Sequence, residues 1–340
     1  DSSEELDAVR QQAKKNGIHA WQYNNISRNS MQNSLTLGEE ETNRRIEAGE
    51  PYVIRIKMPR NQEVKFEDAI RSWVSVNTNN LDDKVLFKSD GMPTYHLANI
   101  VDDHLMEISH VIRGEEWFPS APLHVRLYQC FGWDCPTFAH LPLILKPDGN
   151  GKLSKRDGDR LGFPVFPMNW TNPETNEVSS GYKERGFFPD AFNNMLAFLG
   201  WNPGTDQEIF SMDQLIESFS LERVGKAGAK FDFEKTKWFN QHYLRAKSGE
   251  ELAELIDPTG QYPKQTLAQV AELMKERATL TDDILKDGAY FFEQATEYDA
   301  KTVKKKWKEQ TPSLLIELSE RLEKLDVFEA EQIGISFKAF

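Results

Sequence analysis

The sequence has few cysteines and no long apolar run. Cys130 and Cys135 are its 2 cysteines in 340 residues, which excludes a disulfide framework and leads us to expect a reducing, cytoplasmic compartment. The nearby His124 and His140 do not complete the paired spacing of a zinc knuckle, so we expect no structural zinc and no other metal site. No stretch reaches the roughly 18 apolar residues of a membrane helix. We therefore expect no membrane partner.

Positive charge is also in deficit. The sequence has 41 Lys and Arg against 54 Asp and Glu, a net charge of −13. This balance alone disfavours a nucleic-acid partner, because the phosphate backbone attracts positive surfaces. A hydrophobic fraction of 39% with 8 Trp nonetheless supplies the apolar surface that a folded core needs. The length fits about two domains of roughly 100–200 residues each.

The N-terminal part alternates between helical and strand-like segments. Charge and capping patterns predict helices over 4–15 and 36–48, and β-branched or aromatic runs predict strands over 52–57, 73–76 and 85–87. We therefore predict a mixed α/β module over residues 1–89.

From residue 90 the pattern becomes a strand, helix, strand, helix, strand succession. We predict strands over 94–98, 110–113 and 138–145, and helices over 101–106 and 120–131. This order indicates a parallel sheet with crossover helices. Such sheets bind ligands beyond the carboxyl ends of their strands, so the loops after Ala98, Arg113 and Leu145 are candidate binding loops.

The C-terminal half is mostly helical in pattern. Residues 189–199 form an apolar helix, and Ser211 and Gln214 form a capping box that opens another. Everything after about residue 247 is predicted to be helical, with Leu267, Val270, Leu273 and Met274 sharing one apolar face and Lys and Glu opposite.

The sharpest chemical signal is a basic pentapeptide, Lys152-Leu153-Ser154-Lys155-Arg156, in a loop that starts with Asp148-Gly149-Asn150-Gly151. Three cations and a hydroxyl on a glycine-flanked loop could surround a polyphosphate. A solvated basic turn is the competing interpretation, because charged glycine-rich loops are common.

The pentapeptide resembles the K-M-S-K-S signature of class I aminoacyl-tRNA synthetases, in the form found in glutamyl enzymes. Residues 90–99, 101–104 and 111–117, in that order and spacing, resemble the second half of the catalytic domain of bacterial glutamyl-tRNA synthetases. Residues 221–224 and 231–243 resemble the stem-contact region of the same family. The resemblance covers residues 51–245 and continues weakly to residue 340.

For the fold, the resemblance implies the C-terminal half of a class I synthetase Rossmann-like parallel sheet. It implies an inserted α/β acceptor-binding module over 1–89, half of the catalytic domain over 90–150, the lysine loop and stem-contact region over 151–246, and an incomplete α-helical anticodon-binding domain over 247–340.

For the activity, the resemblance implies ATP-dependent activation of L-glutamate to glutamyl-AMP and transfer to the 3′ end of tRNA(Glu), with Mg²⁺ accompanying ATP. We expect a monomer. The residues carried over are Lys155, Lys152 and Ser154 for catalysis, Arg113, Tyr95 and Asn99 for glutamate, Lys155, Lys152, Glu116 and Trp117 for ATP, and Arg223, Lys226 and Lys230 for tRNA.

The residue chemistry is compatible with these assignments but leaves alternatives open. An Arg fork suits a carboxylate, yet Arg113 could instead pair with Glu115 or Glu116. Tyr95 and Asn99 are expected four apart at the end of a strand, but Tyr95 could be a core tyrosine. Trp117 could likewise be a structural indole.

One family motif is missing from the sequence. The H-I-G-H-type tetrapeptide has no counterpart, since Gly17-Ile18-His19-Ala20 has the wrong order and place. We expect that the chain is a piece starting inside the inserted module and that it cannot activate glutamate alone. The alternatives are a glutaminyl enzyme, another nucleotidyltransferase and a tRNA-binding module without catalysis.

Overall fold

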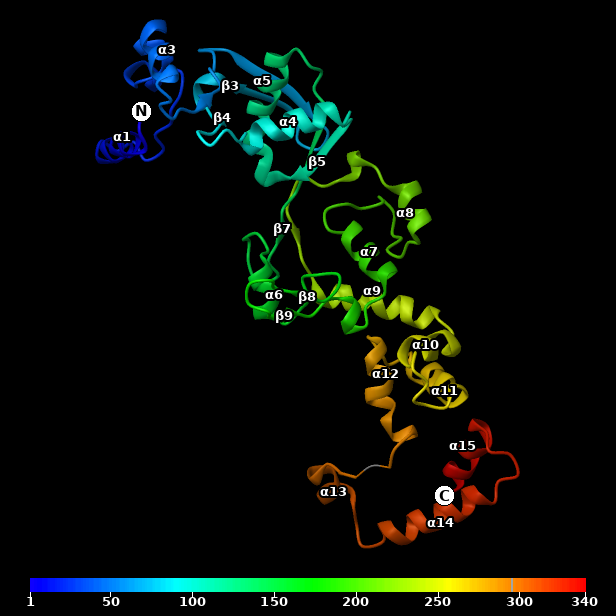
Figure 1. The fold of residues 1–340 in the computed structure, drawn as a ribbon. Helices are drawn as coiled ribbons and strands as arrows, with labels where there is room; N and C mark the ends of the chain where they lie inside the picture. The colour runs from blue at the N-terminus through cyan, green and yellow to red at the C-terminus, as the bar shows by residue number, and fades with distance from the viewer. Residues whose placement is uncertain (295) are drawn as a thin grey trace. The chain divides into compact units, whose positions relative to one another are not determined.

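The computed structural model describes residues 1–294 and 296–340 (Figure 1). It consists of two compact units, one formed by residues 1–247 and 279–281 and the other by residues 248–278 and 282–340. Every strand of the described residues belongs to the first unit. The fourfold division expected from the sequence remains a prediction.

The main sheet of the first unit has four strands in the order β3 (Ser72–Asn77), β2 (Glu63–Asp68), β6 (Thr137–Leu141) and β5 (His110–Gly114). β5 and β6 are parallel and joined by α5 (Ala121–Phe131), which confirms the predicted crossover. β2 also runs parallel to β6, whereas β3 is antiparallel to β2. The sheet is therefore mixed, and it crosses the predicted boundary at residue 89.

The core of this part lies between the sheet and α5. Along β2 the exposed Glu63 and Lys65 alternate with the buried Val64 and Phe66, as expected of a strand with one face in the core. Helix α5 covers that face with Leu123 and Leu127 among other apolar side chains. Burying each such side chain contributes about 1.5–3 kcal/mol.

The predicted strand over 94–98 is wrong, because these residues open helix α4 (Tyr95–Leu105). A short apolar run fits either a strand or a buried helical turn, and here Leu97 and Ile100 share the buried face at helical spacing. Tyr95 and Asn99 therefore lie four residues apart on one helix face, and not at a strand end.

The remaining N-terminal elements match the sequence pattern in part. The predicted helix over 4–15 is confirmed as α1 (Ser3–Lys15) with a capping box. The predicted helix over 36–48 is wrong as one helix, because Gly38 at φ +83° separates α2 (Ser34–Leu37) from α3 (Glu39–Glu47). Only β1 (Ile54–Arg55) forms within 52–57, antiparallel to β4 (Val85–Phe87).

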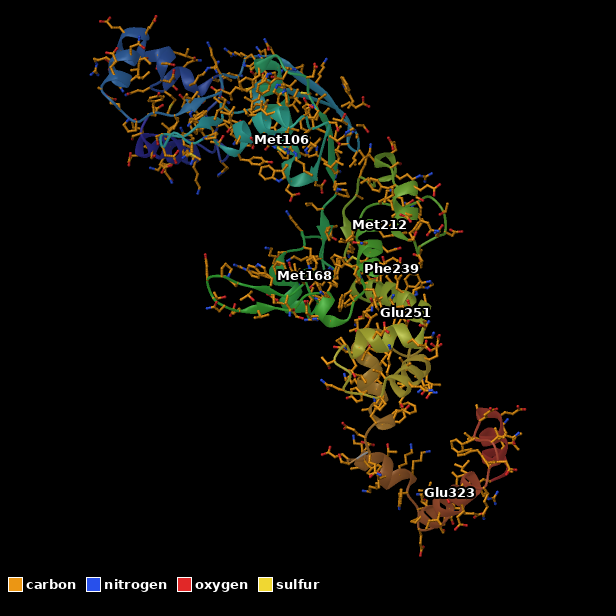
Figure 2. All side chains as sticks on the ribbon, turned by 45° about the vertical axis from the view of Figure 1, so that its right-hand side comes forward. Met106, Met168, Met212, Phe239, Glu251 and Glu323 are labelled. Carbon is orange, nitrogen blue, oxygen red and sulfur yellow. The ribbon has the colours of Figure 1, made fainter. Side chains whose placement is uncertain are left out.

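The segment from residue 144 to residue 246 builds the surroundings of the basic pentapeptide. β7 (Ile144–Leu145) pairs in parallel with β10 (Ala229–Lys230). The other elements are α6 (Lys155–Leu161), the antiparallel hairpin of β8 (Trp170–Thr171) and β9 (Val178–Ser179), α7 (Pro189–Ala197), α8 (Met212–Ser218) and α9 (Phe233–Ala246). The capping box predicted for α8 is confirmed. Phe239 of α9, labelled in Figure 2, is 1% exposed.

A buried asparagine joins three segments here. Asn194 donates from Nδ2 to the Glu208 carbonyl at 2.8 Å, and its Oδ1 accepts from the Phe210 amide at 2.7 Å and from the Tyr243 hydroxyl at 3.0 Å.

Asn194→Ala leaves the buried Phe210 amide unpaired, so we expect this substitution to lower the free energy of unfolding by about 2–3 kcal/mol. Urea unfolding followed by Trp fluorescence measures this. The same change at the partly exposed Asn193 should cost far less, and equal losses would contradict this role.

The second unit is helical in its described residues, as predicted. It contains α10 (Gly249–Ile256), α11 (Lys264–Met274), most of α12 (Thr281–Gly288), α13 (Ala300–Lys306), α14 (Thr311–Glu323) and α15 (Ala330–Ala339). Leu267, Val270 and Met274 of α11 are buried, whereas Leu273, which was expected on the same apolar face, is 63% exposed. In the described ranges, every helix is too short or too polar to span a bilayer.

Candidate active site

Three predicted residues meet beyond the carboxyl end of β5. Arg113 lies near that end, Tyr95 starts α4, and Trp117 lies in the 3₁₀ segment Glu115–Ser120 that follows β5. The rings of Tyr95 and Trp117 are 4.5 Å apart between centroids. This edge is where a parallel sheet places its ligands.

Arg113 presents a partly engaged guanidinium. Its Nε donates to His140 Nε2 at 3.0 Å, and its Nη1 lies 3.2 Å from His124 Nδ1. Its Nη2 is buried and has no hydrogen-bond partner within residues 1–294 and 296–340. Burial lowers the pKa of Arg113, and the Tyr95 hydroxyl opposes this shift. A buried donor of this kind costs free energy until a ligand accepts from it.

The carboxylates that could have competed for Arg113 are occupied elsewhere. Glu115 forms an ion pair with Arg71, and it accepts from the Leu143 amide at 3.1 Å. Glu116 pairs with Lys152. The alternative that Arg113 pairs with either glutamate is therefore not realised in this structure.

Histidines surround the arginine. His140 Nδ1 lies 2.5 Å from Asp68 Oδ2, and His124 Nε2 lies 3.0 Å from His96 Nδ1. Both His124 and His140 are 0% exposed. Because arginine can only donate, the ring nitrogens that face Arg113 must accept. His140 therefore carries its proton on Nδ1 and His124 carries its proton on Nε2.

The electrostatic consequence is largest at His124. Its burial, helped by the charge of Arg113, lowers its pKa to about 3. Burial opposes ionisation of Asp68, but the hydrogen bonds that it accepts from His140 and nearby amides outweigh this and keep its pKa below its usual range. A neutral His124 beside a buried cation avoids like-charge repulsion.

This depressed pKa predicts a pH dependence of stability. The unfolded chain binds a proton at His124 below about pH 6.5, whereas the folded chain stays neutral there down to about 3. The unfolded state therefore gains protons first, and stability falls as the pH drops through that window. We expect His124→Gln to reduce the stability difference between pH 7 and pH 5 by about 1–2 kcal/mol.

Urea unfolding at both pH values, followed by Trp fluorescence, checks this prediction. The matched control is His110→Gln, at an exposed histidine of β5. An unchanged pH dependence in His124→Gln would contradict the neutral assignment of His124.

Asn99 lies four residues after Tyr95 on α4. The Asn99 Nδ2 donates to Asp103 Oδ2 at 3.1 Å. The Asn99 Oδ1 is buried and has no hydrogen-bond partner among the described residues. Burial raises the pKa of Asp103, and the charge of Arg113 opposes this. The structure thus leaves one buried acceptor on Asn99 and one buried donor on Arg113, a complementary set for a polar ligand.

The basic pentapeptide is divided between two environments. Lys152 forms an ion pair with Glu116, which holds the pKa of Glu116 below its usual range. This contact joins Lys152 to the segment that carries Trp117. Lys155 instead lies over two aromatic rings, 5.1 Å from Phe166 and 5.8 Å from Trp170 of β8. Cation–π contacts of this kind contribute about 0.5–1 kcal/mol when exposed.

Ser154 caps helix α6. Its hydroxyl donates to Asp157 Oδ2 at 2.5 Å, and its amide donates to the same oxygen at 2.9 Å. Asp157 also contacts Lys146 at 3.0 Å and Arg160 at 3.3 Å. The hydrogen bonds with Ser154 and Lys146 hold the pKa of Asp157 well below its usual range. In this conformation the Ser154 hydroxyl forms a hydrogen bond within its own segment, to Asp157.

The residues predicted to contact tRNA are exposed. Arg223 lies in a short 3₁₀ turn against Gly204. Lys226 donates to the Ser72 hydroxyl at 2.7 Å, and its carbonyl accepts from Arg71 at 2.6 Å. Lys230 ends β10. These cations belong to the segment after α8 and not to the Arg113 site.

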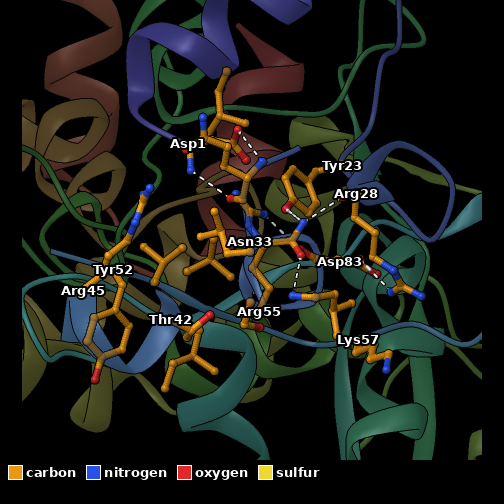
Figure 3. A pocket seen from close by; sticks show the side chains of 18 of the residues that line it. Asp1, Tyr23, Arg28, Asn33, Thr42, Arg45, Tyr52, Arg55, Lys57 and Asp83 are labelled. Atoms are coloured by element: carbon orange, nitrogen blue, oxygen red, sulfur yellow. Dashed lines mark hydrogen bonds and ion pairs between the residues drawn. The ribbon is translucent and has the colours of Figure 1, made fainter. Parts of the chain in front are cut away.

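A separate hollow lies among the first elements of the chain (Figure 3). Arg55 stacks on Tyr23 at 4.3 Å and donates to the Asp83 carbonyl at 2.9 Å, while Arg28 pairs with the Asp83 carboxylate at 3.0 Å. These two arginines therefore stabilise the module internally. Over residues 1–294 and 296–340, no group of three His, Cys, Asp or Glu side chains could hold a metal ion, and Cys130 and Cys135 are exposed free thiols.

Sequence reasoning missed the partners of Arg113. His124 and His140 were considered only as zinc ligands, and Asp68 was not singled out. The available signal was their position, since a histidine within an apolar helix or strand needs a buried hydrogen-bond partner. The pairing of Arg113 with His140 across β5 and β6 requires the strand register, which one sequence does not provide.

Comparison with known proteins identifies the family. Residues 1–238 match the family "tRNA synthetases class I (E and Q), catalytic domain", and residues 251–340 match "Anticodon binding domain". The glutamate–tRNA ligase of Phocaeicola vulgatus is 56% identical over 97% of this chain and 66% of its own length, and that of Christiangramia forsetii is 52% identical over 100% and 68%.

A crystal structure of a glutamate tRNA ligase from Elizabethkingia meningosepticum, in complex with its amino acid, superimposes with a TM-score of 0.92. It is 50% identical, and the match covers 100% of this chain and 68% of that one. The chain therefore belongs to the class I aminoacyl-tRNA synthetases, in the family of the glutamate–tRNA ligases. It spans about two thirds of the length of these relatives.

Proposed function

We propose that the protein activates L-glutamate with ATP and transfers the glutamyl group to the 3′ end of tRNA(Glu). The observation that carries the proposal is the buried, unpartnered Nη2 of Arg113 at the carboxyl end of β5. A buried guanidinium that bonds to two histidine rings and has a further buried donor to satisfy favours an anionic ligand over a neutral one. The side-chain carboxylate of glutamate is such a ligand.

The other groups fit the rest of the amino acid and ATP. Tyr95 and the buried Oδ1 of Asn99 offer polar contacts to glutamate. Trp117 provides a flat apolar surface, while Glu116 and Lys152 are polar groups beside it that suit the nucleotide. In this proposal Lys155 leaves the rings of Phe166 and Trp170 and reaches the phosphates when ATP binds.

The reaction needs no protein nucleophile. The α-carboxylate of glutamate attacks the α-phosphorus of ATP, pyrophosphate leaves, and a ribose hydroxyl of the tRNA then takes the acyl group and releases AMP. The residues position the reactants and offset negative charge. Mg²⁺ bound to the ATP phosphates would offset part of their charge. Lys152 and Lys155 offset the remainder as the pyrophosphate departs.

The tRNA contacts are assigned to two regions. Arg223, Lys226 and Lys230 form a local basic track despite the net charge of −13, and such a track binds RNA with a salt-dependent affinity. The helical region over 251–340 matches an anticodon-binding family. We further infer a monomer that works in the cytoplasm and has no structural zinc.

Aminoacylation tests this function. The protein encoded by the complete gene is incubated with ATP, tRNA from its own organism and radiolabelled glutamate or glutamine. We expect acid-precipitable glutamate and a much slower reaction with glutamine. Charging with glutamine alone would support the glutaminyl alternative, and tRNA binding without charging would support the non-catalytic one.

A further inference from the structure

Behind Arg113 lies a chain of buried polar side chains that the proposed reaction does not itself use. It runs from Asp68 through His140 to Arg113. We propose that Asp68 and His140 are positioning residues that fix the Arg113 fork for the side-chain carboxylate of the amino acid. This inference rests on the proposed function, because it assigns the carboxylate to Arg113.

The two oxygens of Asp68 have different partners. Oδ1 accepts from the backbone amides of Ile70 at 3.0 Å and Arg71 at 2.8 Å in the turn between β2 and β3, and from the His140 amide of β6 at 3.3 Å. Oδ2 accepts from His140 Nδ1 at 2.5 Å. The first oxygen therefore bonds to backbone amides, and the second bonds to the histidine ring. The two roles can therefore be separated by changing one atom.

The Oδ2 contact determines the tautomer of His140. A carboxylate oxygen can only accept, so the ring proton must lie on Nδ1, which leaves the Nε2 lone pair free for Arg113 Nε. With the opposite tautomer, two N–H groups would face each other across 3.0 Å. Arg113 would then have to move. The carboxylate at position 68 thus determines whether Arg113 can form its hydrogen bond with His140 Nε2.

The orientation of Arg113 determines what it can bind. Contacts with His140 and His124 use Nε and Nη1, and only Nη2 is left without a partner. The guanidinium therefore cannot rotate toward other acceptors without breaking these contacts. A fixed donor recognises a carboxylate at lower entropic cost than a mobile one. This arrangement should sharpen the preference for glutamate over glutamine.

The test is Asp68→Asn in the protein encoded by the complete gene. Asparagine can keep its oxygen on the backbone amides of Ile70, Arg71 and His140, but its Nδ2 then donates toward the His140 ring and favours the opposite tautomer. We expect the KM for glutamate in ATP–pyrophosphate exchange to rise about tenfold or more, as for other residues that orient a ligand-binding group. The KM for ATP should stay within about twofold, and the preference for glutamate over glutamine should fall.

The matched control is Asp83→Asn. Asp83 is also buried, at 2% exposed, and it accepts from Arg28 and from the Met58 amide. Its partners in the described part of the chain include Arg28, Arg55 and Met58, which lie outside the Arg113 site, so Asp83→Asn should leave the KM for glutamate unchanged. ¹⁵N NMR of the His140 ring gives a readout independent of activity, and we expect the ring proton to move from Nδ1 to Nε2 in Asp68→Asn only.

A second pair of variants covers the case in which Asp68→Asn does not fold. His140→Phe suits the aromatic surroundings of Phe118 and Phe138 but removes the acceptor for Arg113. His140→Gln can restore that acceptor, so it should recover much of the glutamate affinity that His140→Phe loses. A KM for glutamate that stays within about twofold of wild type in Asp68→Asn and His140→Phe would overturn the positioning role. A wild-type protein that does not activate glutamate would overturn the proposed function instead.

Discussion

Replacing Lys155 with alanine should lower the kcat of glutamate-dependent ATP–pyrophosphate exchange by about 10²-fold. The reason is electrostatic: removing one donor that offsets developing negative charge costs about 3 kcal/mol in the transition state. In the structure Lys155 lies over the rings of Phe166 and Trp170, which are weak contacts. Its loss should therefore change the free energy of unfolding by less than about 1 kcal/mol.

The control for this variant is Lys183→Ala, which removes an exposed lysine from the 3₁₀ turn Lys183–Arg185. Steady-state exchange assays at saturating glutamate and ATP compare the two variants in the protein encoded by the complete gene. Exchange by Lys155→Ala at the parental rate would contradict the assignment of the lysine to the phosphates.

Replacing Arg113 with alanine should raise the KM for glutamate by about 10²–10³-fold, because truncating one partner of a buried charge pair costs about 2–5 kcal/mol. The KM for ATP should change little, since Arg113 contacts histidines and not the pentapeptide. Arg113→Lys keeps the charge but loses the planar fork, so it should fall between alanine and wild type.

Exchange measured over a range of glutamate concentrations separates KM from kcat for these variants. Arg10→Ala on α1, at an exposed arginine, is the control. Equal losses of glutamate and ATP affinity in Arg113→Ala would indicate a general structural defect and contradict a specific glutamate site.

The sequence predicted the fold correctly where short-range patterns determine the local structure. The crossover from β5 through α5 to β6 followed from alternating segment types, and the capping box of α8 followed from side-chain chemistry. The helical conformation of α4 did not follow from the sequence. Its first four residues, 95–98, are apolar or aromatic and fit either a strand or a helix, and packing decides between the two. Strand β2 was missed because its polar residues alternate with only two buried apolar ones.

The candidate site likewise contains residues that the sequence could identify and residues that it could not. Arg113, Tyr95 and Trp117 could be named from a family resemblance, and the structure brings them together. Asp68 and His140 could not, because they reach Arg113 only through the register of three strands that are distant in the sequence. Lys155 shows a further limit, since the rings of Phe166 and Trp170 lie outside the basic pentapeptide and nothing in the sequence indicates that they approach it.

The central claim is that Arg113 selects an amino acid with a side-chain carboxylate. The most direct measurement is ATP–pyrophosphate exchange with glutamate and glutamine in parallel, by the wild-type protein encoded by the complete gene and by its Arg113→Ala variant. The account predicts strong exchange with glutamate in the wild type, little with glutamine, and loss of the difference in the variant. A preference for glutamate that survives in Arg113→Ala would contradict it.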